Sequence, residues 1–286
     1  MLMMLHLKVL FRLLLLVICA MIADQSAHTA EPAIPGYWDE KEKLPKPDLS
    51  GVARVRFLTT VDFPPFNFID ADGRLAGFHI ELARALCREL DIAARCQIQA
   101  LPWDELDEAI ASGQGEALIA GTAITAQTRA LYAFTRPYLR FPARFIAPRA
   151  SRLAEPMHST VMGRRIGVVT GSKHEAMLRR YFPAARPVTY SRPGWLYEDL
   201  RDGKLDGAFG DGMQLSFWLA GSSASGCCRF VGGPYLAPEF LGEGLAIAVT
   251  RDNAVLARAF NHALREIVVN GGFAELYLKY FPVSFY

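Results

Sequence analysis

The chain has 286 residues, of which 51% are hydrophobic and 21% charged, and this composition excludes a disordered, collagen-like or coiled-coil protein. The length suffices for one large core or two smaller ones. Lys and Arg number 31 against 29 Asp and Glu, so the formal net charge is only +2. Because binders of nucleic acids or membrane surfaces usually carry a large positive excess, we expect a small molecule or another protein as the partner.

The first segment, residues 1–30, has the features of a secretory signal peptide. Lys8 and Arg12 accompany an apolar run from Leu13 to Ala23, which is short for a membrane-spanning helix but typical of a signal. The cleavage site is imperfect, so a membrane anchor is the alternative. We expect an exported, periplasmic protein.

Four cysteines follow this segment: Cys87, Cys96, Cys227 and Cys228. In an oxidising compartment this even set could form disulfides. Cys87 and Cys96 enclose a helix end and a short turn, a local loop that a disulfide could close. The adjacent Cys227 and Cys228 could be bonded to each other or reduced. Partners at zinc-ligand spacing are missing from the sequence, so we predict no metal site.

Residues 31–51 are rich in proline and alternating charges, which favours an extended arm. From there on, strand and helix patterns alternate along the chain. Strands are expected over 52–60, 117–120, 165–169, 207–211 and 245–249, and helices over 81–90, after Thr125, from Lys173 and over 255–268, where Gly271 and Gly272 end the pattern. Such alternation predicts two α/β units with mainly parallel sheets, and ligands bind such sheets beyond the C-terminal strand ends.

Candidate binding residues of the first unit lie at strand ends. Phe63 and Trp103 follow the first and second strands, where their rings could stack on a flat or cationic ligand, although core packing explains them equally well. Thr122 ends a strand, and Thr125 and Arg129 begin the next helix. Backbone N–H groups and a guanidinium there could hold a carboxylate. The alternative for Arg129 is a solvated surface charge.

The second unit has a similar set. Ser172 and Lys173 begin a helix directly after a strand, which is a second potential anion site. Asp211 ends another strand, where its carboxylate could accept an ammonium group or cap the following helix. Together with the aromatic residues, these groups complement a zwitterionic amino acid.

Motifs of nucleophilic, metal-dependent, phosphate-binding and dinucleotide-binding enzymes are missing from the sequence. His79 and His174 are lone histidines, which are more often structural than catalytic. We therefore expect a binding protein with no catalytic residues and no cofactor.

Taken in order, several short segments resemble the type-3 extracellular solute-binding proteins of amino-acid ABC importers, in particular the histidine- and lysine/arginine/ornithine-binding proteins. The resemblance runs from about Val52 to Phe281. Its segments are Asp62–Phe66, Gly77–Ala83, Ile124–Thr125, Phe134–Tyr138, Gly167–Ser172, Asp206–Asp211, Asn270–Phe273 and Tyr280–Phe281.

The resemblance implies a two-lobed periplasmic-binding-protein fold of type II. The first lobe would comprise residues 52–140 and 244–286, the second residues 141–243, and two crossover strands would join them across a ligand-binding cleft. Ligand binding would close the lobes, and the closed monomer would dock on a membrane permease. No nucleic acid or cofactor is implied.

The resemblance also assigns residues. Phe63 and Trp103 would stack on the ligand, and Asp211 would bind its α-amino group. The backbone at Gly121, Thr122 and Ala123 and the helix start at Ser172 and Lys173 would contribute further contacts, the latter to the α-carboxylate. Cys87 and Cys96 fall where the histidine-binding branch has a disulfide.

One departure from the family pattern concerns the carboxylate-binding arginine. Three residues separate Thr125 from Arg129 where the family has two, so an unshifted alignment puts Thr128 in the arginine position. One position turns a helical side chain by about 100°, although a local bulge could restore Arg129. Which of the two residues faces the ligand stays open.

We expect a periplasmic protein that captures an amino acid or related carboxylate and delivers it to an ABC importer by lobe closure. One alternative is an accessory or sensor binding protein without transport. The other is an exported enzyme of the cyclohexadienyl-dehydratase type on the same scaffold, in which His174 or Glu243 would be the acid or base.

Overall fold

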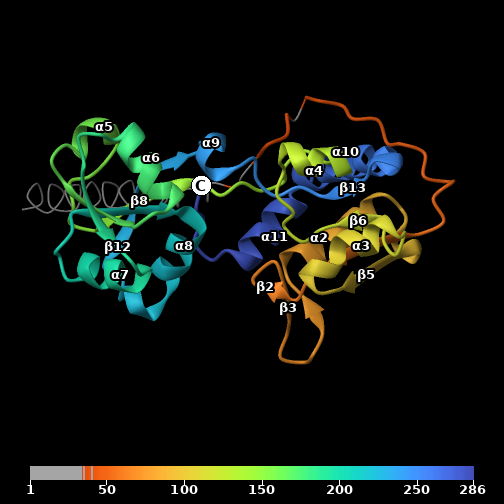
Figure 1. The fold of residues 1–286 in the computed structure, drawn as a ribbon, viewed down its shortest axis with the longest axis horizontal. Helices are drawn as coiled ribbons and strands as arrows, with labels where there is room; N and C mark the ends of the chain where they lie inside the picture. The colour runs from red at the N-terminus through yellow and green to blue at the C-terminus, as the bar shows by residue number, and fades with distance from the viewer. Residues whose placement is uncertain (1–33, 35, 40) are drawn as a thin grey trace, which may run out of the picture. The chain divides into compact units, whose positions relative to one another are not determined.

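The computed structural model describes residues 34–286 apart from 35 and 40, and the expected signal peptide lies outside these residues (Figure 1). The described part of the chain contains no helix both long and apolar enough to span a bilayer. It contains two five-stranded sheets, each flanked by helices (Figure 1).

The sheet of the first lobe has the strand order β5-β1-β6-β13-β7. Its strands are β1 (Val55–Thr59), β5 (Cys96–Ala100), β6 (Ala117–Leu118), β7 (Tyr132–Phe134) and β13 (Ala248–Thr250). The helices of this lobe are α2 (Phe78–Glu89), α3 (Leu106–Ala111), α4 (Ala126–Leu131), α10 (Ala254–Val269) and α11 (Gly272–Tyr280). A small second sheet of β2 (Asp62–Phe63), β3 (Asn67–Ile69) and β4 (Leu75–Ala76) follows β1.

The sheet of the second lobe has the order β10-β9-β11-β8-β12. Its strands are β8 (Ala143–Pro148), β9 (Arg165–Val169), β10 (Arg186–Tyr190), β11 (Gly207–Asp211) and β12 (Cys228–Tyr235). Its helices are α5 (Met157–Thr160), α6 (Lys173–Tyr181), α7 (Pro193–Arg201), α8 (Gly212–Ala220) and α9 (Pro238–Leu241). The two-lobe α/β fold class is confirmed.

Each five-stranded sheet is mixed rather than mainly parallel. β1 runs parallel to β5 and β6, and β9 runs parallel to β10 and β11. The remaining pairs, which involve β7, β8, β12 and β13, are antiparallel. Each of these antiparallel pairs involves β8 or β13, the strands that the chain forms first after it passes from one sheet to the other.

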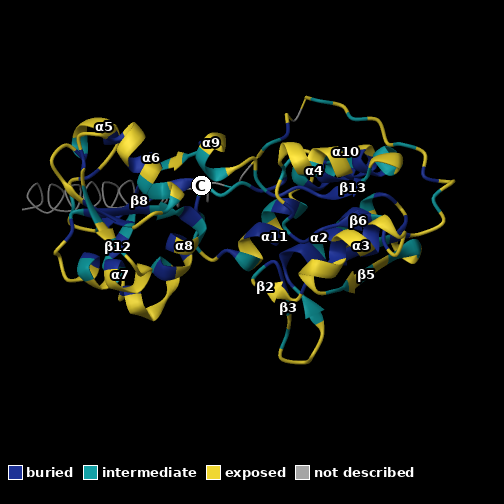
Figure 2. Cartoon of the chain, in the orientation of Figure 1, coloured by how far each residue is buried: buried dark blue, intermediate teal, exposed yellow. Residues whose placement is uncertain are grey.

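The hydrophobic stripe of α10 packs into the core of the first lobe as its spacing predicts. Leu256, Phe260 and Leu264 are buried there, and Figure 2 shows the buried residues gathered on the strands and the inward faces of the helices. Burial of a side chain such as Phe260 contributes about 2–3 kcal/mol. The helix ends before Gly271, whose φ of 84° is a left-handed conformation that glycine adopts without strain.

The described part of the arm has no regular secondary structure, but it is packed rather than free. Trp38 and Leu49 are only 7% and 6% exposed and belong to the first-lobe core. The Arg136 guanidinium lies 5.0 Å from the Trp38 ring centroid and forms two hydrogen bonds to Glu42. These contacts hold the arm against the first lobe.

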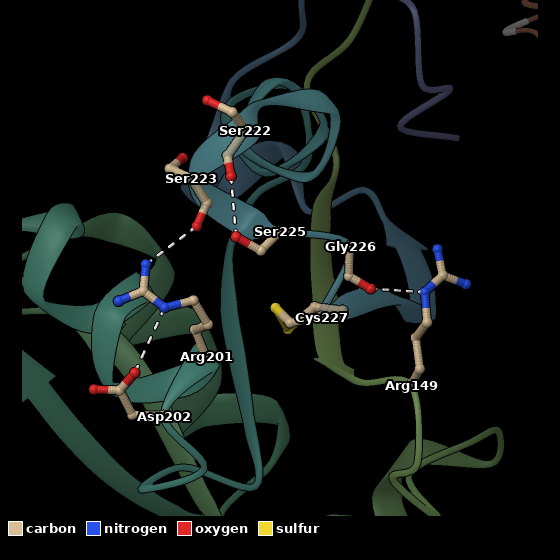
Figure 3. The surroundings of a disulfide bond; sticks show 9 residues. Arg149, Arg201, Asp202, Ser222, Ser223, Ser225, Gly226 and Cys227 are labelled. Atoms are coloured by element: carbon tan, nitrogen blue, oxygen red, sulfur yellow. Dashed lines mark hydrogen bonds and ion pairs between the residues drawn. A yellow bond between two sulfur atoms is a disulfide. The ribbon is translucent and has the colours of Figure 1, made fainter.

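Both pairs of cysteines are bonded. Cys87 at the end of α2 is joined to Cys96 at the start of β5, which confirms the disulfide that the resemblance implied. Cys227 and Cys228 are joined to each other at the start of β12. Arg149 Nε donates a 2.9 Å hydrogen bond to the carbonyl of Gly226 beside this pair (Figure 3).

Candidate functional site

Phe63 and Gly121 are brought together at the edge of the first-lobe sheet. Phe63 ends β2 and is half-buried, and its ring stacks on Phe66 with centroids 4.8 Å apart. Gly121 has a φ of 89°, and a Cβ atom there would lie 3.1 Å from the Phe63 ring. Glycine therefore allows both the left-handed backbone conformation and the close approach of the Phe63 ring. This contact joins two of the residues predicted to bind ligand.

Trp103 presents its ring to solvent rather than to the core. It begins a short 3₁₀ helix (Trp103–Glu105) after β5 and is 54% exposed. Its ring borders a cavity of about 240 Å³ that Thr60 and Asp62 also line. Asp62 precedes Phe63 in the chain, so Trp103 and Phe63 lie on neighbouring parts of the same lobe.

The loop from Thr122 to Thr128 is organised by a helix cap. Thr122 is buried. Thr125 is the N-cap of α4 and accepts a hydrogen bond from the Thr128 backbone N–H. The Thr128 hydroxyl in turn accepts from the Thr125 N–H at 2.9 Å and contacts the Ala123 carbonyl oxygen at 2.7 Å. The Thr128 side chain is therefore engaged within the loop.

Arg129 is the residue of α4 whose side chain reaches a carboxylate. Its Nη2 lies 2.7 Å from Oε2 of Glu243, and the two side chains are 52% and 45% exposed. α4 is a regular helix of six residues, with no bulge. The geometry gives Arg129 an anion partner and Thr128 none. The sequence suggests Glu243 only as a catalytic acid or base. It gives no sign of the ion pair with Arg129, because the two residues are 114 positions apart.

The second-lobe residues meet at the C-terminal ends of β9 and β11. Ser172 is the N-cap of α6: its hydroxyl accepts from the Glu175 N–H at 3.0 Å and donates to the Val169 carbonyl at 2.7 Å. Lys173 is exposed at the first position of this helix. The first backbone N–H groups of a helix have no intrahelical acceptor, so those of Lys173 and His174 are suited to an anion.

Asp211 lines a cavity of about 320 Å³ together with Ser172, His174 and Tyr197. One of its oxygens, Oδ1, caps α8 by accepting a 2.9 Å hydrogen bond from the Gln214 N–H. Burial raises the pKa of Asp211 above its ordinary value, while the Gln214 N–H opposes that rise. The two interpretations of Asp211 from the sequence are thus compatible, because the same carboxylate caps α8 and lines the cavity.

His174 and Tyr197 were not assigned as ligand-binding residues from the sequence. Nε2 of His174 is buried with no hydrogen-bond partner among the described residues, and burial lowers the pKa of its imidazole. Tyr197 stacks on Trp218 at 4.7 Å, and burial raises its pKa to about 12. The sequence contained a sign of the position of His174, because this histidine lies two residues after the helix cap Ser172. The sequence contained no such sign for Tyr197, because its place in the cavity depends on how α7 packs.

His79, by contrast, is structural, as a lone histidine was expected to be. It is fully buried, and its two ring nitrogens lie 2.8 Å from Asn67 Oδ1 and the Tyr138 hydroxyl. Burial lowers its pKa to about 3, so the ring is neutral at physiological pH. The described residues include no cluster of three or more potential metal ligands.

Comparison with known proteins places these features in a family. Residues 55–283 match the family model described as bacterial extracellular solute-binding proteins, family 3. The chain is 30% identical over 227 residues to the putative ABC transporter arginine-binding protein 2 of Escherichia coli K12, covering 79% of this chain and 90% of that protein. It is 28% identical to the lysine/arginine/ornithine-binding periplasmic protein of the same strain, covering 81% and 89%.

The solved structures agree with this fold. The L-cystine solute receptor of Neisseria gonorrhoeae superposes with a TM-score of 0.68 at 18% identity, covering 81% of this chain and 94% of that one. The relatives are named as binding proteins and not as enzymes, which confirms the expectation of a binding role without catalysis. The chain belongs to the bacterial extracellular solute-binding proteins of family 3.

Proposed function

We propose that this protein captures an L-amino acid in the periplasm and delivers it to an ABC importer. The observation that carries the proposal is the second-lobe cavity, in which an acidic side chain, Asp211, lies beside the N-terminus of α6. The carboxylate suits an α-ammonium group, and the free N–H groups of the helix suit an α-carboxylate. These two groups are common to all α-amino acids.

The first lobe would supply the remaining contacts. Phe63 and Trp103 offer aromatic rings, the backbone at Gly121, Thr122 and Ala123 offers polar groups, and Arg129 offers a guanidinium that already holds the Glu243 carboxylate. A ligand that contacts both lobes would favour a closed arrangement by its differential affinity. The closed monomer would then dock on the membrane permease. Residues 1–30 would direct export as a signal peptide.

Relatives named for arginine, histidine and lysine/arginine/ornithine binding make the cationic amino acids the first ligands to test. The test is a calorimetric titration of the exported protein with each common L-amino acid at pH 8.0, supported by thermal-shift measurements. We expect one or a few amino acids to bind with micromolar or lower Kd. Neither heat nor a thermal shift with any of them would overturn the proposal.

A further inference from the structure

Two polar groups with hydrogen-bonding capacity to spare line the second-lobe cavity. One is Nε2 of His174, which is buried and has no hydrogen-bond partner among the described residues. The other is the carboxylate of Asp211, which accepts from the Gln214 N–H through Oδ1 and also has a backbone hydrogen bond from Met213. Buried polar atoms are usually paired, because an unsatisfied one costs about 1–3 kcal/mol. Both residues line the cavity of about 320 Å³.

The surroundings of His174 keep its imidazole neutral. Burial lowers its pKa, the Asp211 carboxylate opposes this, and the neighbouring Lys173 ammonium adds to it. Tyr197, contributed by α7, is the other titratable group of the cavity, and burial holds it in the protonated phenol form. On the β11 side the imidazole faces the uncharged ring of Phe209, with centroids 6.4 Å apart.

A neutral imidazole whose proton is on Nδ1 leaves a lone pair on Nε2, so that beside a carboxylate it forms a cavity wall rich in lone pairs. An alkylammonium group carries up to three N–H donors and a positive charge, so it satisfies both acceptors at once. A carboxylate in the same place would be repelled by Asp211. The arrangement thus selects the ammonium end of an amino acid.

We propose that His174 is a second acceptor for the ligand's ammonium group, acting with Asp211, and that the ligand is released when His174 gains a proton. This inference rests on the proposed function, in which Asp211 receives the ammonium. Protonation removes the Nε2 lone pair and places a positive charge beside the ligand's own. Affinity is therefore highest when His174 is neutral and falls as the pH drops through its pKa.

The size of the effect follows from linkage. Below the pKa of His174 in the free protein, each bound ligand must displace one proton, so Kd rises up to tenfold per pH unit. Because burial lowers that pKa, the loss begins below the ordinary value of 6.5. Protonation of Asp211 weakens binding in the same direction, so a variant at position 174 is needed to separate the two.

The experiment measures the Kd of L-arginine and L-glutamine by calorimetry between pH 8.0 and 4.5, a range in which neither ligand side chain titrates. The variant is His174→Gln, whose amide oxygen can accept a hydrogen bond but does not titrate. The control is His158→Gln, which changes an exposed histidine on α5. Circular dichroism at each pH confirms that the variants are folded.

For the wild type and H158Q we expect Kd to rise at least tenfold more over this range than for H174Q. NMR titration of the imidazole should show the pKa of His174 falling when ligand is added. The same pH profile in H174Q as in the wild type, or a pKa that rises on binding, would overturn the inference while leaving the proposed function intact. If no common L-amino acid binds the wild type at pH 8.0, both proposals are contradicted.

Discussion

Asp211 both caps α8 and lines the candidate cavity. Its Oδ1 accepts from the Gln214 N–H, and Met213 provides a further backbone hydrogen bond to the carboxylate. Asparagine is as good an N-cap as aspartate, so the capping role survives its substitution. The negative charge, which only ligand binding needs, is lost in this substitution.

Asp211→Asn is therefore expected to leave stability within about 0.5 kcal/mol of the wild type and to weaken amino-acid binding by about 2–4 kcal/mol through loss of a buried charge partner. Calorimetry and denaturant unfolding measure the two quantities. Asp202→Asn, which changes an exposed aspartate at the end of α7, is the matched control. Unchanged affinity in D211N would remove Asp211 from the binding site.

A second prediction concerns His79 and the pH dependence of the free energy of unfolding. The unfolded chain binds a proton at this histidine with a pKa near 6.5, whereas burial lowers the folded value to about 3. Its contribution to stability is thus fully present above pH 6.5 and is lost as the pH falls, by up to about 1.4 kcal/mol per pH unit. Between pH 7.5 and 5.0, His79→Gln should lose less unfolding free energy than the wild type. An equal loss would show that His79 is protonated in the folded protein; H158Q serves as the control.

At the scale of elements, α4 meets the segment that leads into the first lobe's last strand. Arg129 holds Glu243 in the structure, so a ligand carboxylate that binds Arg129 must first displace that side chain. This geometry results from the regular helix: in an undistorted α4, the Thr128 side chain points toward the N-cap Thr125 and the Arg129 side chain points outward.

Glu243→Gln removes the competing charge and should tighten amino-acid binding about two- to fivefold, a modest gain because both side chains are about half exposed and the pair is screened by water. Arg129→Ala should weaken binding. Calorimetry in parallel on both variants tests this. Weaker binding by E243Q would show that Glu243 assists the ligand instead of competing with it.

The arm has no regular secondary structure, yet we expect it to contribute to the free energy of unfolding. Trp38→Ala removes a side chain from the first-lobe core and should reduce the free energy of unfolding by about 3 kcal/mol. Lys43→Ala, at an exposed position of the same arm, should have no measurable effect. Denaturant unfolding at pH 7.5 compares them, and a difference below about 0.5 kcal/mol between the two variants would mean that the arm is only loosely attached.

At the scale of the whole molecule, the predicted contacts are divided between two lobes. Phe63 and Gly121 belong to the first, Ser172 and Asp211 to the second. We expect small-angle scattering to show a smaller radius of gyration once a saturating amino acid is added, because one ligand can satisfy both halves only if they approach. An unchanged radius with a calorimetrically bound ligand would contradict lobe closure. The lobe boundaries at residues 140 and 243 likewise stay a prediction.

The amino-acid sequence by itself determined the elements and their faces. The spacing of Leu256, Phe260 and Leu264 predicted the buried stripe of α10, and Thr125 predicted the start of α4, because helix periodicity and capping depend on residues a few positions apart. The alternation of strands and helices likewise predicted two α/β lobes.

Only the tertiary structure decided which distant residues meet. Arg129 and Glu243 are 114 positions apart, and Tyr197 reaches the cavity of Asp211 because α7 packs beside β11. It also decided that half of the strand pairs in the two five-stranded sheets are antiparallel and that Nε2 of His174 has no partner among the described residues. Periodicity specifies the face that an element buries, whereas the partner of that face depends on how the whole chain packs.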